Sequence, residues 1–155
     1  MKRKIFAVLA AAWCGLIFYL SSQPGDESSR TSGGFINFFC ELIVPDFSGF
    51  SGAGRAEFVE NLQFIVRKCA HMGEYAILFW LGAHALSVSG AKHPARTALI
   101  VCVLYASGDE FHQCFSDGRG PSPIDVMIDT VGASAALGLR AAALHIRRHK
   151  KGKPA

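Results

Sequence analysis

The stretch from Tyr105 to Asp129 limits the fold more than any other part of the chain, because it places charged and amide side chains between two apolar segments. The segment before it is TALIVCVLYA and the segment after it is VMIDTVGASAALGLRAAAL. Both are apolar enough to be membrane-embedded helices. Ionisable groups at the ends of such helices are costly unless they are paired or functional. We therefore expect these side chains to contact one another.

Residue spacing predicts a helix hairpin in this stretch. Asp109, His112 and Gln113 stand at positions i, i+3 and i+4, so they share one face if the apolar run continues as a helix. Asp125 and Asp129 share a face on the next helix. Between them, SDGRGPSP is typical of a tight loop and SPID of a helix N-terminus with a proline in its first turn. We expect carboxylates to face across the hairpin.

The composition is that of a membrane protein with an all-α fold. The chain has 155 residues, of which 50% are hydrophobic and 18% charged, with a mean hydropathy of +0.27. This is more apolar than a typical soluble domain. We predict a single membrane domain over residues 1–155, built as a four-transmembrane-helix bundle. The predicted spans are residues 5–22, 68–89, 97–114 and 123–145, followed by a basic tail at 146–155.

The first apolar segment has two interpretations, a membrane span or a signal peptide. Ile5 to Leu20 is an apolar run of about 16 residues, or roughly 24 Å of helix against a hydrocarbon core of about 30 Å. A basic start and an apolar core also fit a signal peptide. The run ends in YLSSQP, which contains no small-residue cleavage site. We therefore favour an uncleaved span that relies on its flanking residues.

Two further helical patterns lie between the first and third spans. The apolar residues of Phe35 to Ile43 fall at helical spacing, but the segment is too short to span. We expect an extra amphipathic helix in the outer loop, and favour packing against the domain over a lipid-binding role at the interface. From Arg55 the pattern is helical again to the end of the second span, which predicts one long helix.

The positions of the basic residues predict the orientation. The N-terminus, the turn from Lys92 to Arg96 and the tail carry lysine and arginine without an acid. All aspartates and glutamates lie between Asp26 and Asp129. The positive-inside rule then places both termini and the middle turn in the cytoplasm. The net charge of +4 therefore reflects membrane topology, and we expect no nucleic-acid partner.

Helix lengths place the polar side chains of the second, third and fourth spans within roughly 10 Å of the outer surface. They form one set, which we call the polar layer and predict to be the functional site. Its members are Arg67, Lys68, His71, Glu74, Asp109, Glu110, His112, Gln113, Arg119, Asp125 and Asp129.

Several motifs include these residues. The first span ends in FYLSSQ at residues 18–23, the second begins with RKCAHMGEYAIL at 67–78, and the third ends in SGDEFHQ at 107–113. Gly118-Arg119 follows, then Asp125, Asp129 and Gly132. In order and spacing these motifs resemble those of the VanZ-like family, named for a protein associated with teicoplanin resistance. The resemblance implies a multispanning bacterial membrane protein linked to glycopeptide tolerance.

Four roles for the polar layer remain open. It can be a network that fixes the helices, or a site for a lipid-linked headgroup, in which arginine pairs with phosphate. It can be a metal- or acid/base-dependent hydrolase, although no HExxH or nucleophile motif is present, or a proton-coupled transporter. We favour a noncatalytic factor that alters susceptibility to teicoplanin-type glycopeptides. Its expected partners are membrane lipids, including a lipid-linked cell-wall precursor, and we assign no catalytic residue, metal or cofactor. The oligomeric state is left open.

The cysteines and one isolated histidine are given structural roles. The five cysteines form no CxxC pair, and those in apolar helices are expected to behave as small hydrophobic residues. A Cys40–Cys114 disulfide on the outer side is an alternative. His84 is expected to be packed or interfacial.

Overall fold

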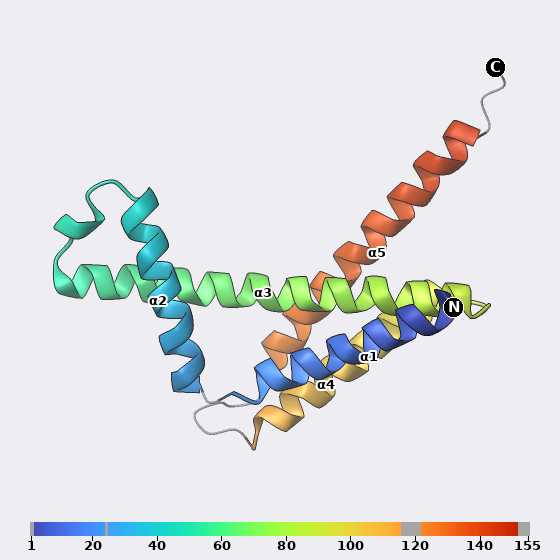
Figure 1. The fold of residues 1–155 in the computed structure, drawn as a ribbon, viewed down its shortest axis with the longest axis horizontal. Helices are drawn as coiled ribbons and strands as arrows, with labels where there is room; N and C mark the ends of the chain where they lie inside the picture. The colour runs from blue at the N-terminus through green and yellow to red at the C-terminus, as the bar shows by residue number, and fades with distance from the viewer. Residues whose placement is uncertain (1, 24, 116–121, 152–155) are drawn as a thin grey trace.

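The computed structural model describes residues 2–23, 25–115 and 122–151, and their side chains over 4–23, 32–115 and 122–149. The regular structure of these residues is helical throughout, which confirms the all-α class (Figure 1). The elements are α1 (Lys2–Ser21), α2 (Gly25–Ile43), a short 3₁₀ helix η1 (Phe47–Gly49), α3 (Gly52–Val88), α4 (Pro94–Gln113) and α5 (Pro123–Lys151).

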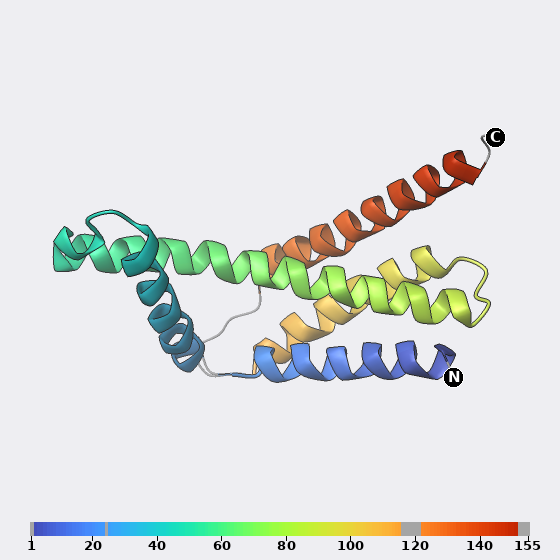
Figure 2. The same ribbon diagram turned by 45° about the horizontal axis from the view of Figure 1, so that its top comes forward.

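Helix α3 forms the long axis of the molecule. It has 37 residues, which confirms the prediction of one long helix from the Arg55 region to the end of the second predicted span. At about 1.5 Å per residue it is far longer than the roughly 30 Å hydrocarbon core of a bilayer. Helices α1 and α4 lie along its C-terminal half, and α5 starts beside its middle and diverges from it (Figure 2). Helix α2 crosses its N-terminal half.

Small residues bring α5 close to α3. A Cβ atom added to Gly132 would lie only 2.2 Å from the backbone oxygen of Met72. Ala133 and Ala136, on the same helix, are also buried. Small side chains at such positions let two helix backbones approach closely. Gly132 and its small neighbours therefore let the start of α5 pack closely on α3.

Two clusters of buried side chains hold the helices together. The larger cluster joins α1, α3, α4 and α5, and consists of Ile17, Tyr75, Leu78, Phe79, Ala83, Ala98, Cys102, Ala106, Ala133 and Ala136. Long-range hydrogen bonds add to it, because the Trp13 indole donates to the Glu74 carbonyl oxygen (2.9 Å) and the Tyr105 hydroxyl donates to the Cys14 carbonyl oxygen (2.7 Å). The smaller cluster packs α2 and η1 onto the start of α3, with Ile36, Cys40, Phe47 and Val59.

The outside of the bundle is strongly apolar. Large hydrophobic side chains such as Val8, Leu104 and Leu139 are exposed on α1, α4 and α5. Among the described helices, two are long and apolar enough to cross a membrane, namely α1 over Lys4–Ser21 and α5 over Pro123–His149. The second half of α3 and the end of α4 carry charged residues of the polar layer. Their composition therefore does not identify them as spans.

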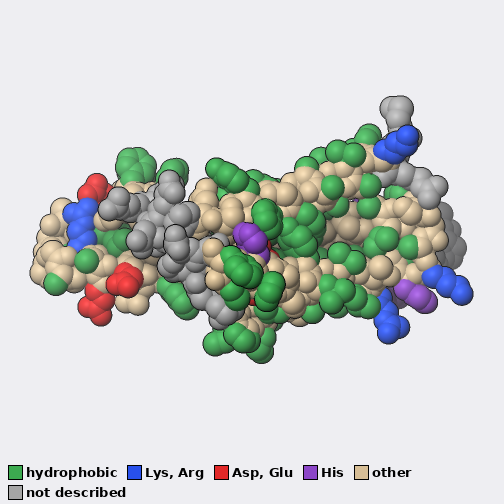
Figure 3. All heavy atoms as spheres, turned by 90° about the horizontal axis from the view of Figure 1, so that it is seen from below, with side chains coloured by type: hydrophobic (Ala, Val, Ile, Leu, Met, Phe, Trp, Pro, Cys, Tyr) green, Lys and Arg blue, Asp and Glu red, His purple; other side chains and the backbone are tan. Residues whose placement is uncertain are grey.

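Charge is distributed along the long axis. The start of α1, the turn between α3 and α4 and the end of α5 lie at the same end of the molecule (Figures 1 and 2). Lysine and arginine side chains are visible at this end in Figure 3. The exposed basic residues of these segments are Lys4, Lys92, Arg96, Arg147 and Arg148.

Several local details differ from the sequence predictions. Helix α2 begins at Gly25, well before Phe35, and η1 was not predicted. Helix α5 continues to Lys151, because the predicted basic tail has good helix formers and neither glycine nor proline before residue 152. All five cysteines are free, so the Cys40–Cys114 disulfide does not form. His84 is packed as expected, between the rings of Phe6 and Trp80.

Candidate functional site

Helix α5 begins beside α3, near the ends of α1 and α4 (Figures 1 and 2). The described residues of the polar layer belong to the middle of α3, the end of α4 and the start of α5. Four of its side chains are almost fully buried, namely Asp109, Glu110, Gln113 and Asp129. Burying charged groups is costly unless they are paired or hydrogen-bonded. Arg119, also predicted for this layer, lies outside the described residues.

One ion pair connects α3 with the first turn of α5. The Lys68 ammonium group contacts the Asp125 carboxylate, and both side chains are largely shielded from solvent. The pairing is consistent with their positions, since Lys68 faces α5 and Asp125 projects from the first turn of that helix. Removing either partner would leave the other charge poorly compensated. The pair therefore holds the two helices in register.

A second contact connects α4 with the start of α5. Glu110 Oε2 accepts a hydrogen bond from the backbone N–H of Ser122 at 2.8 Å. The Ser122 carbonyl oxygen in turn accepts from the N–H of Asp125 at 2.9 Å, so Ser122 immediately precedes the first turn. Backbone N–H groups at a helix start have no partner within the helix. Glu110 supplies one from another helix, as the third-position glutamate does in a capping box.

A third contact connects α4 with the end of α1. The Gln113 side chain donates a hydrogen bond to the Ser21 hydroxyl at 2.8 Å, and its amide nitrogen lies 3.5 Å from Asp109 Oδ2. All three side chains are buried. We call these three contacts the interhelical ties, namely Lys68–Asp125, Glu110–Ser122 and Gln113–Ser21. Together they fix the ends of α1 and α4 and the start of α5.

His71 stands between two carboxylates. Its Nδ1 atom lies 3.7 Å from Asp129 Oδ1 on α5 and 3.9 Å from Glu74 Oε2 one turn along α3. Asp129 is only 1% exposed. A protonated His71 would therefore form an ion pair with a buried carboxylate across the α3–α5 contact.

His112 has a different environment. Its ring packs on Phe18 of α1, with 4.3 Å between the ring centroids. Within the described part of the chain, His112 Nδ1 has no hydrogen-bond partner. The helical spacing placed His112 on the α4 face that carries Asp109 and Gln113. The structure gives it an aromatic contact with α1, the helix that Gln113 also contacts.

A cavity of about 200 Å³ opens beside His71 and Glu74, and we call it the polar cavity. It lies between the end of α1, the middle of α3 and the Ser32 region of α2. Its lining residues are Ile17, Leu20, Ser21, Gln23, Ser32, Gln63, Val66, Arg67, Ala70, His71 and Glu74. Of the described residues of the polar layer, only Arg67, His71 and Glu74 line it. Four others form the interhelical ties, namely Lys68, Glu110, Gln113 and Asp125, while Asp109, His112 and Asp129 belong to neither set.

Sequence reasoning missed several polar residues of this cavity. Ser21 and Gln23 belong to the FYLSSQ motif, but no role was assigned to them. Gln63 stands four residues before Arg67, so helical spacing alone would have placed it on the same face. Ser32, whose hydroxyl accepts a hydrogen bond from the Gln63 amide at 2.8 Å, lies on another helix and has no such signal.

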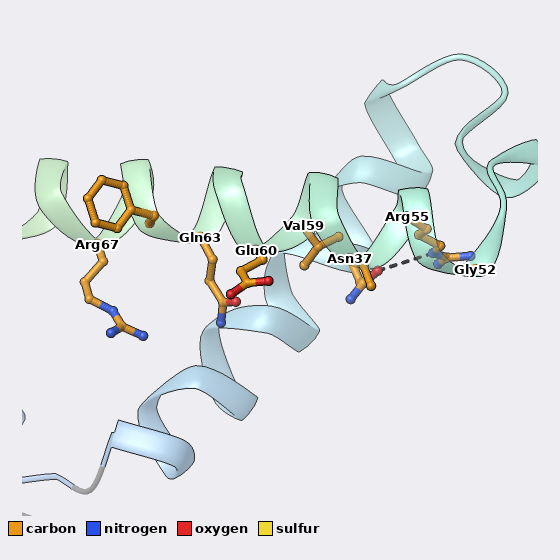
Figure 4. Close-up of a pocket in the computed structure, with 9 residues that line it drawn as sticks. Asn37, Gly52, Arg55, Val59, Glu60, Gln63 and Arg67 are labelled. Atoms are coloured by element: carbon orange, nitrogen blue, oxygen red, sulfur yellow. Dashed lines mark hydrogen bonds between the residues drawn. The ribbon is translucent and has the colours of Figure 1, made fainter. Parts of the chain in front are cut away.

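Two larger cavities lie farther toward the start of α3. One, of about 570 Å³, is lined mainly by apolar residues of α2 and α3, and we call it the apolar cavity. The other, of about 670 Å³, is lined by Arg55, Glu60, Gln63 and Arg67, among others. Figure 4 shows Glu60, Gln63 and Arg67 projecting from α3 on the side where α2 crosses. Arg55 holds α2 there through an ion pair with Glu41.

A metal site requires several ligand side chains arranged around one point. Over the described residues, no group of three or more histidine, cysteine, aspartate or glutamate side chains has an arrangement that could hold a metal ion. His71 and Glu74 lie near each other, and both line the polar cavity.

Comparison with known protein families assigns the chain to one of them. Residues 6–144 match the sequence profile of the VanZ/LLP1 family, which covers all of the helices that surround the polar layer. Searches of curated proteins and of solved structures gave no match. The family match covers well over half of the chain and agrees with the motifs at residues 18–23, 67–78 and 107–113. The chain therefore belongs to the VanZ/LLP1 family.

Proposed function

We propose that this protein spans the membrane four times and binds the polar headgroup of an outer-leaflet lipid in its polar cavity. We further propose that this binding alters the susceptibility of the cell surface to teicoplanin-type glycopeptides. The observation that carries the proposal is the lining of the polar cavity, which combines apolar residues of α1 and α3 with Arg67, His71 and Glu74. Such a lining suits an amphiphile.

The proposed topology has α1, the second half of α3, α4 and α5 as the spans, with both termini in the cytoplasm. Its support is the concentration of exposed basic residues at the end of the molecule where α1 starts, α3 turns into α4 and α5 ends. Membrane proteins carry an excess of lysine and arginine on their cytoplasmic side. The polar cavity lies toward the opposite end of the spans, at the depth of the outer leaflet.

The side chains of the cavity indicate the chemistry of the headgroup. Arginine binds phosphate through two parallel hydrogen bonds, and Arg67 is the cavity residue suited to this role. Glu74 and His71 can accept hydrogen bonds from hydroxyl, amide or ammonium groups. We therefore propose a headgroup that carries a phosphate together with hydrogen-bond donors. A lipid-linked cell-wall precursor has this chemistry, and no bond-breaking step is assigned.

The division of the polar layer favours binding over a purely structural role. Lys68, Glu110 and Gln113 have clear partners on other helices, so the ties account for them. Arg67 and Glu74 line the polar cavity, where a ligand could reach them. Variants of the cavity and variants of the ties should therefore have different effects.

The functional test is the teicoplanin susceptibility of a sensitive Gram-positive host that expresses the protein. We would compare the wild type with Glu74→Gln and with Glu57→Gln, a matched change on an exposed residue of the same helix. At equal membrane abundance, we expect Glu74→Gln to lose protection and Glu57→Gln to keep it. Retained protection in Glu74→Gln would refute the assignment of the cavity. Failure of the wild type to protect would refute the glycopeptide role.

Binding is tested separately with purified protein in detergent micelles. Phosphatidylglycerol carries a phosphate and two hydroxyl donors, whereas phosphatidylcholine carries a phosphate and no donor on its headgroup. We expect saturable binding of phosphatidylglycerol that exceeds binding of phosphatidylcholine and is weakened by Arg67→Gln. Equal binding of the two lipids, unaffected by Arg67→Gln, would contradict a headgroup site in this cavity.

A further inference from the structure

The apolar cavity adjoins the polar cavity. Its lining consists of Gln23, Ser32, Phe35, Ile36, Phe39, Leu62 and Val66, and its volume of about 570 Å³ is within the usual range for ligand sites. Three of these residues, Gln23, Ser32 and Val66, also line the polar cavity. The two cavities therefore share one wall, formed where α2 lies against α3.

Polarity changes in one direction across this wall. Gln23 and Ser32 are the polar residues in the lining of the apolar cavity, and both belong to the shared wall. The remaining lining is aromatic or aliphatic, and none of it is charged. On the other side of the wall lie Arg67, His71 and Glu74. This gradient is complementary to a molecule with a charged head and a hydrocarbon chain.

The position of the apolar cavity makes an occupant favourable. Its lining residues come from α2, from α3 and from the segment just after α1. Figures 1 and 2 show that α2 crosses α3 beyond the ends of α1 and α4. Leu62 precedes the predicted second span, which starts at residue 68, by roughly 9 Å of helix. In the proposed topology, headgroups and water rather than lipid chains surround the protein at that level. Phe35 and Phe39, which are 68% and 46% exposed, would contact this polar environment unless the cavity is filled.

We propose that the apolar cavity holds part of a hydrocarbon chain of the same lipid whose headgroup occupies the polar cavity. The proposal rests on the headgroup site described above and adds that the ligand is recognised as a whole lipid. A free phosphate ester would occupy the polar cavity alone. Bound as proposed, the lipid is partly lifted out of the leaflet, with its chain held between α2 and α3.

The test uses phosphatidylglycerol with a photoactivatable diazirine on one acyl chain. The full-length protein is placed in nanodiscs of phosphatidylcholine and irradiated with this lipid. The cross-linked residues are then mapped by mass spectrometry. We expect cross-links on Phe35, Phe39 and Leu62 that unlabelled phosphatidylglycerol suppresses. Diazirine lipid that is free in the bilayer would label the outward-facing side chains of α1 and α5. These cross-links serve as the internal reference.

Two pairs of substitutions on α2 separate the cavity from a simple membrane anchor. Phe35→Ser with Phe39→Ser removes two aromatic residues of the cavity. Phe38→Ser with Leu42→Ser removes two side chains of similar exposure, 64% and 72%, that do not line it. Because the first pair removes the apolar contact of two aromatic residues with the lipid chain, it should lower the yield of lipid cross-links to α2 and α3 about tenfold. The control pair should stay within about twofold of the wild type.

The outcomes distinguish this inference from the headgroup site on which it rests. Suppressible cross-links in the apolar cavity that only the first pair reduces would support both. Saturable, Arg67-dependent binding with cross-links confined to α1 and α5 would overturn the chain site and leave the headgroup site intact. Equal losses in both pairs would overturn it in favour of α2 as an interfacial anchor. Absence of saturable binding would overturn both proposals.

Discussion

Gly132→Ala should separate α3 from α5, and the structure allows the effect to be worked out. The added Cβ would lie 2.2 Å from Met72 O, 2.7 Å from its Cα and 2.8 Å from its carbonyl carbon, whereas ordinary contacts begin at 3.4 Å. All three atoms belong to the backbone, so no side-chain rotation relieves the clash. The helices would have to move apart by roughly 1 Å, which also weakens the dispersion contacts of their neighbours.

The expected cost combines overpacking with weakened polar contacts. Forcing an extra methyl group into a packed interface costs about 1–3 kcal/mol. The same movement lengthens the Lys68–Asp125 ion pair and the His71–Asp129 contact, both of which cross this interface. We therefore expect Gly132→Ala to lower the free energy of unfolding by about 2–3 kcal/mol, near the top of the range for overpacking.

The assay is reversible unfolding in mixed micelles, followed by circular dichroism. Gly138→Ala is the matched control, because it makes the same change on the same helix and nothing lies within 4 Å of its added Cβ. The control should be neutral or stabilising by up to about 1 kcal/mol, as alanine is the better helix former. If Gly132→Ala proved as stable as Gly138→Ala, the close approach of α3 and α5 would be wrong.

Three further predictions concern contacts between helices, two of them interhelical ties, and use the same unfolding assay. Glu110→Ala leaves the N–H of Ser122 without its acceptor and should cost about 1–3 kcal/mol, whereas Glu110→Gln keeps an acceptor and should cost less. A similar loss in both Glu110 variants would argue against the hydrogen bond. Lys68→Met leaves a partly buried Asp125 unpaired and should cost about 1–3 kcal/mol, with Lys68→Met and Asp125→Leu combined recovering most of it. Tyr105→Phe removes one neutral hydrogen bond to Cys14 O of α1 and should lower the free energy of unfolding by about 1 kcal/mol. No measurable change would show that this hydrogen bond does not stabilise the protein.

Local chemistry explains why parts of the fold were predictable. The serine and proline at residues 122 and 123 identified the start of α5 to the residue, because an N-cap and a first-turn proline act within one turn. The start of α2 was not predictable in this way. Its first turns read GDESSRTSGG, rich in serine and glycine, which are poor helix formers. Here tertiary packing of the later apolar residues on α3 outweighs local propensity.

The site was predictable along each helix but not between helices. His71 and Glu74 stand three positions apart on α3, so helical spacing places them on one face, and His71 Nδ1 lies 3.9 Å from Glu74 Oε2. The partner of Glu110 is a backbone N–H, which no pattern of side chains reveals. Gln113 reaches Ser21, 92 positions away in the sequence, and the relation between α1 and α4 depends on the packing of the whole bundle. Long-range pairs of this kind follow from the tertiary structure alone.

Arg67 and Lys68 show how helix geometry assigns two roles to adjacent residues of one type. Successive residues of an α-helix differ by about 100° in direction, so the two side chains leave α3 toward different neighbours. Lys68 reaches Asp125 of α5 and stabilises the bundle, while Arg67 faces the polar cavity between α1 and α2. Charge alone therefore does not distinguish, in this layer, a residue that joins helices from one that lines the cavity. The direction of each side chain does, and it makes Lys68 the natural stability control for any loss of binding observed at Arg67.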